Sequence, residues 1–306
     1  MILLDAMMQL YRANYKLQDL QTRDGRPTGM EFGFCKSIEA LRRFFKDEII
    51  LCWEGQRNFR YEIDPEYKAN RRDKRKRDAH SFLTPDRVSA FREFLLMIAE
   101  NAHDNELEAD DIIASLAKRY SKTERVVIYS SDKDLHQLIS DGDMDEDGVV
   151  KEGGQFPVVQ LKSYAWRDQL WTAGKIQLEY DGITPSQFTM YQAFAGDSID
   201  NIPGVERVSR AKIANAIRCG HTAANISNYE LFSTNEIFTL EEHISSGRFD
   251  KNLSLVTLKI KDDINVIQRD WQPEKIGQWL NSMEFRSLKI CHECGLEQTI
   301  DDDEEF

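Results

Sequence analysis

The sequence predicts an α/β protein whose core is a doubly wound, mostly parallel β-sheet. Three short apolar runs, at residues 2–4, 48–53 and 126–129, have the length and composition of buried strands. Segments with apolar residues at helical spacing separate these runs. Strands that alternate with helices favour a parallel sheet covered by helices on both faces. We therefore expect residues 1–195 to form an α/β core, followed by a helical region.

Helices are expected at residues 36–46, 89–102 and 108–120, where apolar residues recur every three or four positions. Beyond about residue 185 the pattern becomes helical and polar, and Asn201 to Gly204 has the composition of a turn between two helices. Residues 140–156 are acidic and rich in glycine, so they predict a loop.

The composition narrows the class of protein. With 306 residues and 41% hydrophobic side chains, the chain can bury a substantial core. Five cysteines, an odd number, fit no disulfide framework and predict reduced thiols in the cytoplasm. No apolar run approaches the roughly 20 residues of a membrane span, so no membrane partner is expected. The net charge of −13 does not exclude nucleic acid, because steering depends on local patches.

Nine acidic residues stand where a strand run ends or a helix begins. They are Asp5, Glu54, Glu108, Asp110, Asp111, Asp132, Asp134, Asp197 and Asp200. Ligands bind outside the carboxyl ends of the strands of such sheets, so the topology should gather several of these side chains. Converging carboxylates repel one another unless cations neutralise them, and oxygen ligands without His or Cys favour Mg²⁺ or Mn²⁺. Two such ions, ~3.5–4 Å apart, form an apparatus for hydrolysing phosphodiesters. The acids therefore predict a metal-dependent nuclease.

Each acidic group also has a simpler explanation. Acids in the first turn of a helix interact favourably with its dipole, which accounts for one or two of the residues from Glu108 to Asp111. Asp132 and Asp134 could cap the loop after a strand, and Asp197 or Asp200 could cap a helix. Three acids in four positions before a buried helix face exceed what the dipole explains. The pair at 197 and 200 is, by its residues alone, equally consistent with both interpretations.

A basic segment at residues 68–77 contains seven Lys or Arg residues in ten positions. Such a run is either a solvated face or a phosphate-binding patch. Beside an acidic metal site such a segment would bind the phosphates of the substrate, because neutralising phosphates supplies most non-specific affinity for nucleic acid. Tyr67, just before it, could stack on a base.

Two further motifs fail on inspection. Asp143, Asp145 and Asp147 resemble the start of a calcium loop, but the position that requires a bidentate Glu is Gly154. Cys291 and Cys294 have zinc-like spacing but no second pair nearby. Calcium and zinc are therefore not expected.

Taken together, the motifs resemble those of the 5′-nuclease (flap endonuclease) superfamily, in particular the 5′–3′ exonuclease domains of bacterial family A DNA polymerases and free-standing bacteriophage 5′–3′ exonucleases. The resemblance runs from Leu3 to about Glu297. It rests on Leu4-Asp5, Gly25-Arg26-Pro27-Thr28-Gly29, Glu108-Ala109-Asp110-Asp111, Ser131-Asp132-Lys133-Asp134, Gly196-Asp197-Ser198-Ile199-Asp200-Asn201-Ile202-Pro203-Gly204-Val205 and Met283-Glu284-Phe285-Arg286-Ser287-Leu288.

The resemblance implies a PIN-like nuclease core and assigns roles to residues. Asp5, Glu54, Glu108 and Asp110 would hold one metal ion, and Asp132, Asp134 and Asp197 a second, with Asp111 and Asp200 in support. Residues 58–90 would form a basic helical arch, from which Lys68 and Arg71 or Arg72 contact the scissile phosphate. Residues 196–297 would form a helical DNA-binding region with a helix-three-turn-helix motif, and residues 298–306 an acidic tail.

Further residues would contact DNA. They are Tyr11, Arg12, Arg60, Tyr67, Lys74, Arg75, Gly204, Arg207, Ser209, Arg210 and Lys212. A monovalent cation could bind near Gly204 to Ser209, although Arg207 and Ser209 replace the glycines usual there. Glu54 also departs from the usual Asp.

The expected substrate is DNA with a 5′ end, flap or nick, or an RNA–DNA hybrid, cut during primer or flap removal. We expect a cytoplasmic monomer (in the host cytoplasm if phage-encoded). The acidic tail, which ends in Phe306, could dock on a replication protein. The competing hypothesis is a non-catalytic, structure-specific DNA-binding module. Glu54 in place of Asp, and Arg207 and Ser209 in place of glycines, would suit that hypothesis.

Overall fold

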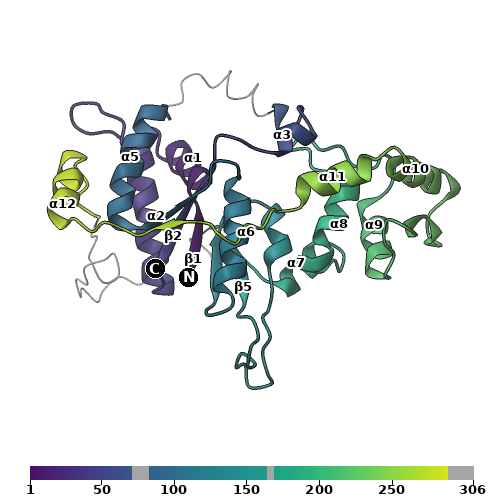
Figure 1. Ribbon diagram of the computed structural model, residues 1–306. Helices are drawn as coiled ribbons and strands as arrows, with labels where there is room; N and C mark the ends of the chain where they lie inside the picture. Colours follow the sequence, from purple (N-terminus) through teal and green to yellow (C-terminus); the bar gives the residue numbers. More distant parts are fainter. Residues whose placement is uncertain (71–82, 164–168, 289–306) are drawn as a thin grey trace.

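The structure, a computed structural model, describes residues 1–70, 83–163 and 169–288 (Figure 1). A seven-stranded sheet has the order β6-β5-β4-β1-β2-β3-β7. Its strands are β1 (Ile2–Asp5), β2 (Ile49–Trp53), β3 (Glu100–His103), β4 (Val126–Tyr129), β5 (Val158–Leu161), β6 (Leu170–Trp171) and β7 (Val266–Ile267). The five central strands are parallel, and the two edge strands β6 and β7 are antiparallel to their neighbours. The predicted α/β class and mostly parallel sheet are confirmed.

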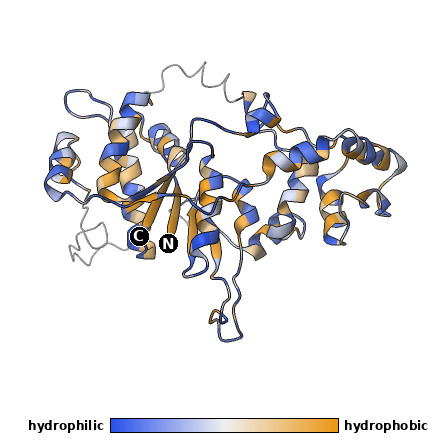
Figure 2. Cartoon of the chain, in the orientation of Figure 1, coloured by the Kyte–Doolittle hydropathy of each residue, from blue (hydrophilic) through white to orange (hydrophobic). Residues whose placement is uncertain are grey.

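Helices cover both faces of this sheet, as a doubly wound fold requires. Leu3, Ile50 and Ile128 pack toward α6 (Ala109–Tyr120). The alternate residues Ile2 and Leu4 pack toward a layer formed by α1 (Ala6–Lys16), α2 (Gly29–Phe45) and α5 (Pro85–Ile98). Because successive strand residues point to opposite faces, strands buried on both sides are apolar throughout. Figure 2 shows this as strands of continuous hydrophobic colour between helices of mixed colour.

The register of the sheet aligns the strand ends that matter for function. Asp5 at the end of β1 is paired with Cys52 in β2, and Leu4 is opposite both Leu51 and Tyr129. The residues that follow β1, β2 and β4 therefore emerge at the same edge of the sheet. Parallel strands thus place Asp5, Glu54 and the loop after Tyr129 together, as the sequence predicts.

The helices of the second region (Figure 1) enclose a hydrophobic cluster of their own. The elements of this region are α7 (Ala173–Glu179), α8 (Pro185–Ala195), α9 (Arg210–Arg218), η3 (Ile226–Asn228), α10 (Thr234–Ser245) and α11 (Arg248–Val256). Ile176 and Phe188 pack in it with Ile213 and Phe249, so the region begins before residue 196. The chain then returns to the core, because β7 pairs with β3 and Ile276 of α12 (Pro273–Ser282) joins the α2–α5 layer. The expected division at 195 and the expected helical region to 297 both differ from this arrangement.

The segment 89–102 was expected to be one helix, but α5 ends at Ile98 and β3 follows at once. Ala99 is extended, and β3 pairs with β2 although its sequence Glu-Asn-Ala-His has little intrinsic strand preference. The side chain of Asn101 accepts a hydrogen bond of 2.6 Å from the Trp53 indole. Tertiary pairing, rather than local propensity, therefore decides this element.

The acidic segment predicted as a loop is a loop. It lies between η1 (Asp134–Leu138) and β5, with isolated bridges between Ser140 and Val158 and between Met144 and Val150. In Figure 1 it projects away from the body of the molecule. Among the described residues, no helix combines the length and apolar composition needed to cross a membrane.

Candidate active site

A cavity of about 540 Å³ opens at the carboxyl edge of the sheet. Seven of the nine predicted acids line it: Asp5, Glu54, Glu108, Asp110, Asp132, Asp197 and Asp200. They come from the ends of β1 and β2, the start of α6, the loop after β4 and the loop after α8. Segments separated by almost 200 residues of sequence therefore converge on one site.

Short-range hydrogen bonds fix the first carboxylates. Asp5 caps α1, since its Oδ1 accepts a hydrogen bond of 3.0 Å from the Met8 amide. Its Oδ2 accepts from the Ser130 hydroxyl at 3.2 Å, and the same hydroxyl accepts from the Asp132 amide at 3.2 Å. Asp132 Oδ1 in turn accepts from the amide of Asp134 at 3.0 Å. The loop after β4 is thus tied to the end of β1.

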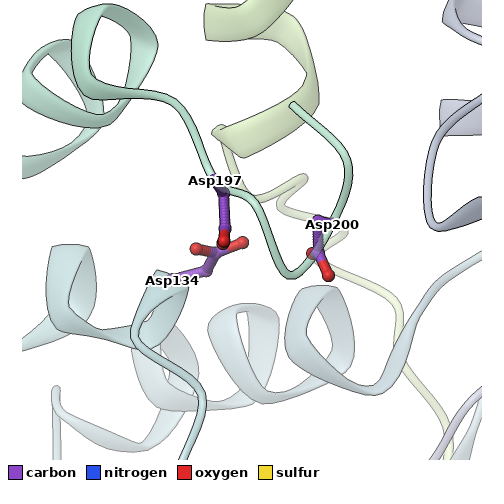
Figure 3. A group of neighbouring side chains, drawn as sticks. All are labelled: Asp134, Asp197 and Asp200. Atoms are coloured by element: carbon purple, nitrogen blue, oxygen red, sulfur yellow. The ribbon is translucent and has the colours of Figure 1, made fainter. Parts of the chain in front are cut away.

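A second group joins Asp134 to the loop after α8. Figure 3 shows Asp134, Asp197 and Asp200, which offer oxygens within 4.8 Å of one another. The loop is tight because Asp197 and Ile202 exchange both backbone hydrogen bonds, at 2.7 and 2.8 Å. Gln192 holds Asp134 by donating to its Oδ1 at 2.5 Å. Neither residue is the cap of α8 or α9, whose adjoining caps are Gly196 and Ser209, and the role of Asp197 and Asp200 as metal ligands stays a prediction.

The electrostatics of the cavity favour bound cations. Burial raises the pKa of Asp5 to about 6, and neighbouring Asp132 adds to the effect. Burial and the charges of Asp132 and Asp5 raise the pKa of Asp110, and burial with Asp132 raises that of Asp134. Asp110 Oδ1 is buried and has no hydrogen-bond partner in the described part of the chain. An oxygen acceptor buried without a donor is costly, so hard divalent cations fit this donor set.

Two lysines partly neutralise the acids. Lys68 Nζ lies 2.5 Å from Glu108 Oε1 and 3.8 Å from Asp200 Oδ2, and the Lys68 amide donates to the Asp200 carbonyl at 2.9 Å. Lys133 Nζ lies 3.2 Å from Asp197 Oδ2. Lys68 therefore reaches the acidic cluster from the start of the basic segment, and the phosphate contact expected of it stays a prediction.

Comparison with known proteins identifies the family. Residues 1–152 match the family described as 5′–3′ exonuclease, N-terminal resolvase-like domain. A 5′–3′ exonuclease of Buchnera aphidicola (subspecies Schizaphis graminum) is 32% identical over 68% of this chain and 66% of its own length. The chain belongs to the 5′-nuclease superfamily. The thermostable DNA polymerase I of Thermus aquaticus is 28% identical over 96% of the chain, which spans only 33% of that polymerase.

A solved structure supports the 5′-nuclease fold. The bacteriophage T5 D15 flap endonuclease, crystallised in a complex with DNA and metal ions, superimposes with a TM-score of 0.62 at 20% identity. The match covers 84% of this 5′-nuclease and 88% of the phage protein. At this identity the likeness establishes the fold.

Three predicted site residues of this 5′-nuclease have other roles. Asp111 was expected among the metal residues, but it is fully buried and both of its oxygens pair with the Arg60 guanidinium, at 2.7 and 2.8 Å. Arg60, expected to contact DNA, is therefore buried too. Tyr67 was expected to stack on a base, but only 1% of it is exposed. Its hydroxyl lies 3.2 Å from Glu108 and 3.3 Å from Asp200, so it contacts two carboxylates that line the cavity.

The remaining expected DNA contacts divide by their surroundings. Tyr11 is exposed and lines the cavity, while Arg12 donates to the Tyr129 hydroxyl at 3.2 Å. Lys212 is paired with both oxygens of Glu236, at 2.8 and 2.9 Å. Arg210 lies near the carbonyl of Ala195. Residues Arg71, Arg72, Lys74, Arg75 and 298–306 lie outside the described part of the chain.

The segment from Gly204 to Ser209 keeps the shape of a turn although Arg207 and Ser209 stand in it. A Cβ added to Gly204 would lie 2.4 Å from the Ala195 carbonyl oxygen, so this glycine permits close backbone packing. Arg207 has φ of +57°, a left-handed conformation that glycine adopts more easily. Ser209 is the N-cap residue of α9. The backbone shape of a glycine turn is thus kept at Arg207 without the glycine, and a monovalent cation there stays a prediction.

Two lysines and a tyrosine are among the cavity residues that sequence reasoning missed. Lys133, Lys162 and Tyr180 all line the site. Lys133 stood inside a recognised motif, between Asp132 and Asp134, and its charge was the available signal. Lys162 follows β5, a strand that was not predicted, so nothing in the local sequence marked it.

Proposed function

We propose that this chain is a divalent-metal-dependent 5′-nuclease that hydrolyses phosphodiesters near the 5′ ends of DNA. The observation that carries the proposal is the convergence of seven carboxylates in one cavity, where a buried oxygen of Asp110 has no donor among the described residues. The names of its relatives, 5′–3′ exonuclease and DNA polymerase I, support the same activity. A role in primer or flap removal during replication and repair follows.

Two Mg²⁺ or Mn²⁺ ions suit the donor set. Asp5, Glu54, Glu108 and Asp110 would hold one, and Asp132, Asp134 and Asp197 the other, with Asp200 beside them. When bound, such ions supply charge neutralisation, polarisation of the phosphate and activation of water. Asp111 is left out of this set, because Arg60 occupies its oxygens.

The residues of the chain hold and orient the reacting groups. Tyr67 and Gln192 donate hydrogen bonds to carboxylates and so fix their directions before substrate arrives. Lys68 lies at the cavity with its ammonium 2.5 Å from Glu108, within reach of an entering phosphate. Charge placed where negative charge develops lowers the barrier to phosphoryl transfer, and Lys68 would provide it.

The substrate proposed is DNA with a 5′ end, flap or nick, with RNA–DNA hybrid as a second possibility, acted on by a monomer. Helices α8 and α9, joined by residues 196–209, would grip the duplex with Arg207 and Arg210. The tail 298–306 is proposed to dock on a replication protein. A non-catalytic DNA-binding module is disfavoured, because binding alone gives no reason to keep repelling carboxylates.

One experiment tests the activity. A 5′-labelled flap or nicked duplex is incubated with the protein, with and without MgCl₂, and the products are resolved on a gel. We expect cleavage only with Mg²⁺, abolished by Asp132→Asn or Asp110→Asn while DNA binding stays largely intact. Asp147→Asn, in the exposed loop, is the matched control and should cleave at the wild-type rate. Cleavage at the wild-type rate by either site variant in Mg²⁺ would refute the nuclease assignment.

A further inference from the structure

Lys162 is a cavity residue to which none of the family motifs assigns a role. It follows Leu161 at the end of β5, and its side chain lines the cavity together with the acids. Its ammonium nitrogen lies 3.6 Å from the centre of the Trp171 ring and 3.5 Å from His136 Nε2. The aromatic face attracts the cation, so the side chain is held in a defined position.

A chain of hydrogen bonds connects this lysine to the metal-ligand loop. Gln160 Nε2 donates to the carbonyls of Ser130 and Asp132, at 2.9 and 2.6 Å, so its Oε1 must face His136. His136 Nδ1, 2.7 Å from that oxygen, is then the protonated nitrogen, and Nε2 is left to accept from Lys162. His136 also stacks on Trp171, with ring centres 4.4 Å apart. The seat of Lys162 is therefore rigid and fixed relative to Asp132.

The ammonium group of Lys162 has no salt-bridge partner within the described chain. Lys68 and Lys133, the other lysines of the cavity, pair with Glu108 and Asp197. Among the residues that the structure describes, Lys162 forms no ion pair with a carboxylate, and its ring and imidazole neighbours carry no negative charge. Burial, together with the nearby cation of Lys175, lowers the pKa of Lys162 to about 8, while the charges of Asp132 and Glu179 act in the opposite direction. A half-buried cation that no salt bridge engages is available to bind an anion from outside.

We propose that Lys162 binds a phosphate of the nucleic-acid strand that enters the cavity and so positions that strand over the carboxylates. The proposal rests on the proposed nuclease function, since the phosphate belongs to its substrate. An ammonium on a fixed aromatic seat suits a phosphodiester oxygen, which accepts charge-assisted hydrogen bonds. Lys162 acts from the β5 side, separately from Lys68, which lies at the start of the basic segment.

The test uses single-turnover cleavage of a labelled flap in MgCl₂ over a range of enzyme concentrations, which gives a maximal rate and a half-saturating concentration. Lys162→Met keeps the packing on Trp171 but removes the charge, and Lys162→Arg keeps the charge. The matched control is Lys175→Met, because Lys175 lies 5.2 Å from the same ring but does not line the cavity. Thermal melting confirms that each variant folds.

We expect Lys162→Met to lower the ratio of rate to half-saturating concentration about 10- to 100-fold, as loss of a charged hydrogen bond implies. The slope of log affinity against log salt should fall by about one. Lys162→Arg should recover most of the loss, and Lys175→Met should match the wild type. With single neutral methylphosphonate linkages, one position near the cut should impair the wild type but add nothing to Lys162→Met.

The outcomes separate this proposal from the nuclease assignment. If the wild type cleaves and Lys162→Met matches it in rate and salt slope, the phosphate contact is refuted while the nuclease function stands. Equal losses from Lys162→Met and Lys175→Met would also refute it, since they would trace the effect to the packing of Trp171. If the wild type does not cleave any flap in Mg²⁺, the proposed function itself fails.

Discussion

Replacing Arg60 with Met tests whether this arginine stabilises the fold or contacts DNA. Its guanidinium forms two hydrogen bonds with Asp111, and its Nε donates to the Leu255 carbonyl at 2.8 Å. NH1 also lies 3.0 Å from Glu108 Oε2. Arg60 is 2% exposed and Asp111 0%, so the variant would leave a carboxylate buried without its cation. It would also remove a charge that holds Glu108 at the cavity.

Breaking a buried ion pair by removing one partner costs about 3–5 kcal/mol. For a chain of this size that corresponds to a fall in melting temperature of roughly 5–8 °C. Urea unfolding and thermal melting measure both quantities. Arg57→Met, at an exposed position in the same segment, should change the unfolding free energy by no more than about 0.5 kcal/mol.

The double variant Arg60→Met with Asp111→Asn should recover part of the loss. The amide carries no charge, and its oxygen can still accept from the Lys259 amide, which lies 2.8 Å from Asp111 Oδ1. The reasoning is refuted if Arg60→Met costs less than about 1 kcal/mol while DNA affinity falls sharply. That result would restore the DNA contact inferred from the sequence.

Four other changes have expected outcomes. Lys68→Ala should slow flap cleavage far more than it weakens binding, and loss of affinity alone would make Lys68 only a phosphate anchor. Because the folded pKa of Asp5 is raised from 3.8 to about 6, its stabilising contribution is present below pH 3.8 and lost as pH rises through 6. Across this range the unfolding free energy of the metal-free wild type should therefore fall by about 3 kcal/mol relative to that of Asp5→Asn. MgCl₂ should raise the melting temperature more at pH 8 than at pH 5. Urea unfolding that shows no such dependence on pH would contradict this reasoning. Arg207→Gly should raise the unfolding free energy by roughly 0.5–1 kcal/mol by relieving its left-handed backbone, and an unchanged or lower value would show no strain there. Deleting residues 298–306 should abolish docking on a replication protein, and it should strengthen DNA binding at low salt if the acidic tail also competes with DNA. Unchanged partner binding would remove the docking role, and an unchanged salt dependence of DNA affinity would remove the competing one.

The acids could be found from the sequence because strand ends of a parallel sheet share an edge. Asp5 and Glu54 each follow a recognisable apolar run, and the register of β1 with β2 brings them to that edge. Nothing comparable exists for Arg60, whose partner Asp111 lies 51 residues away. A basic residue near a basic segment resembles a DNA contact until its burial is known. Burial, which only the fold reveals, separates the two cases.

The parts that escaped prediction are those set by tertiary contacts. β3 lacks strand-forming residues and exists because β2 offers it backbone partners. Lys162 acquires its place from Trp171 and His136, which lie 9 and 26 residues away in the sequence. An isolated lysine after an unrecognised strand carries no local signal. The role of Lys162 can be inferred only from its contacts with Trp171 and His136 and from the cavity that it lines.

The charges of the cavity favour binding of divalent cations before the nucleic-acid strand. Among the described residues that line the cavity, two lysines already pair with carboxylates, and the remaining acids outnumber Lys162. Without divalent cations the cavity is therefore negative, and it repels the phosphate that Lys162 attracts. Cations held by the carboxylates would reverse this balance, and Lys68 would then be free to leave Glu108 and face the substrate. Mg²⁺ should thus promote entry of the strand into the cavity as well as its cleavage, so that one set of ligands controls both steps.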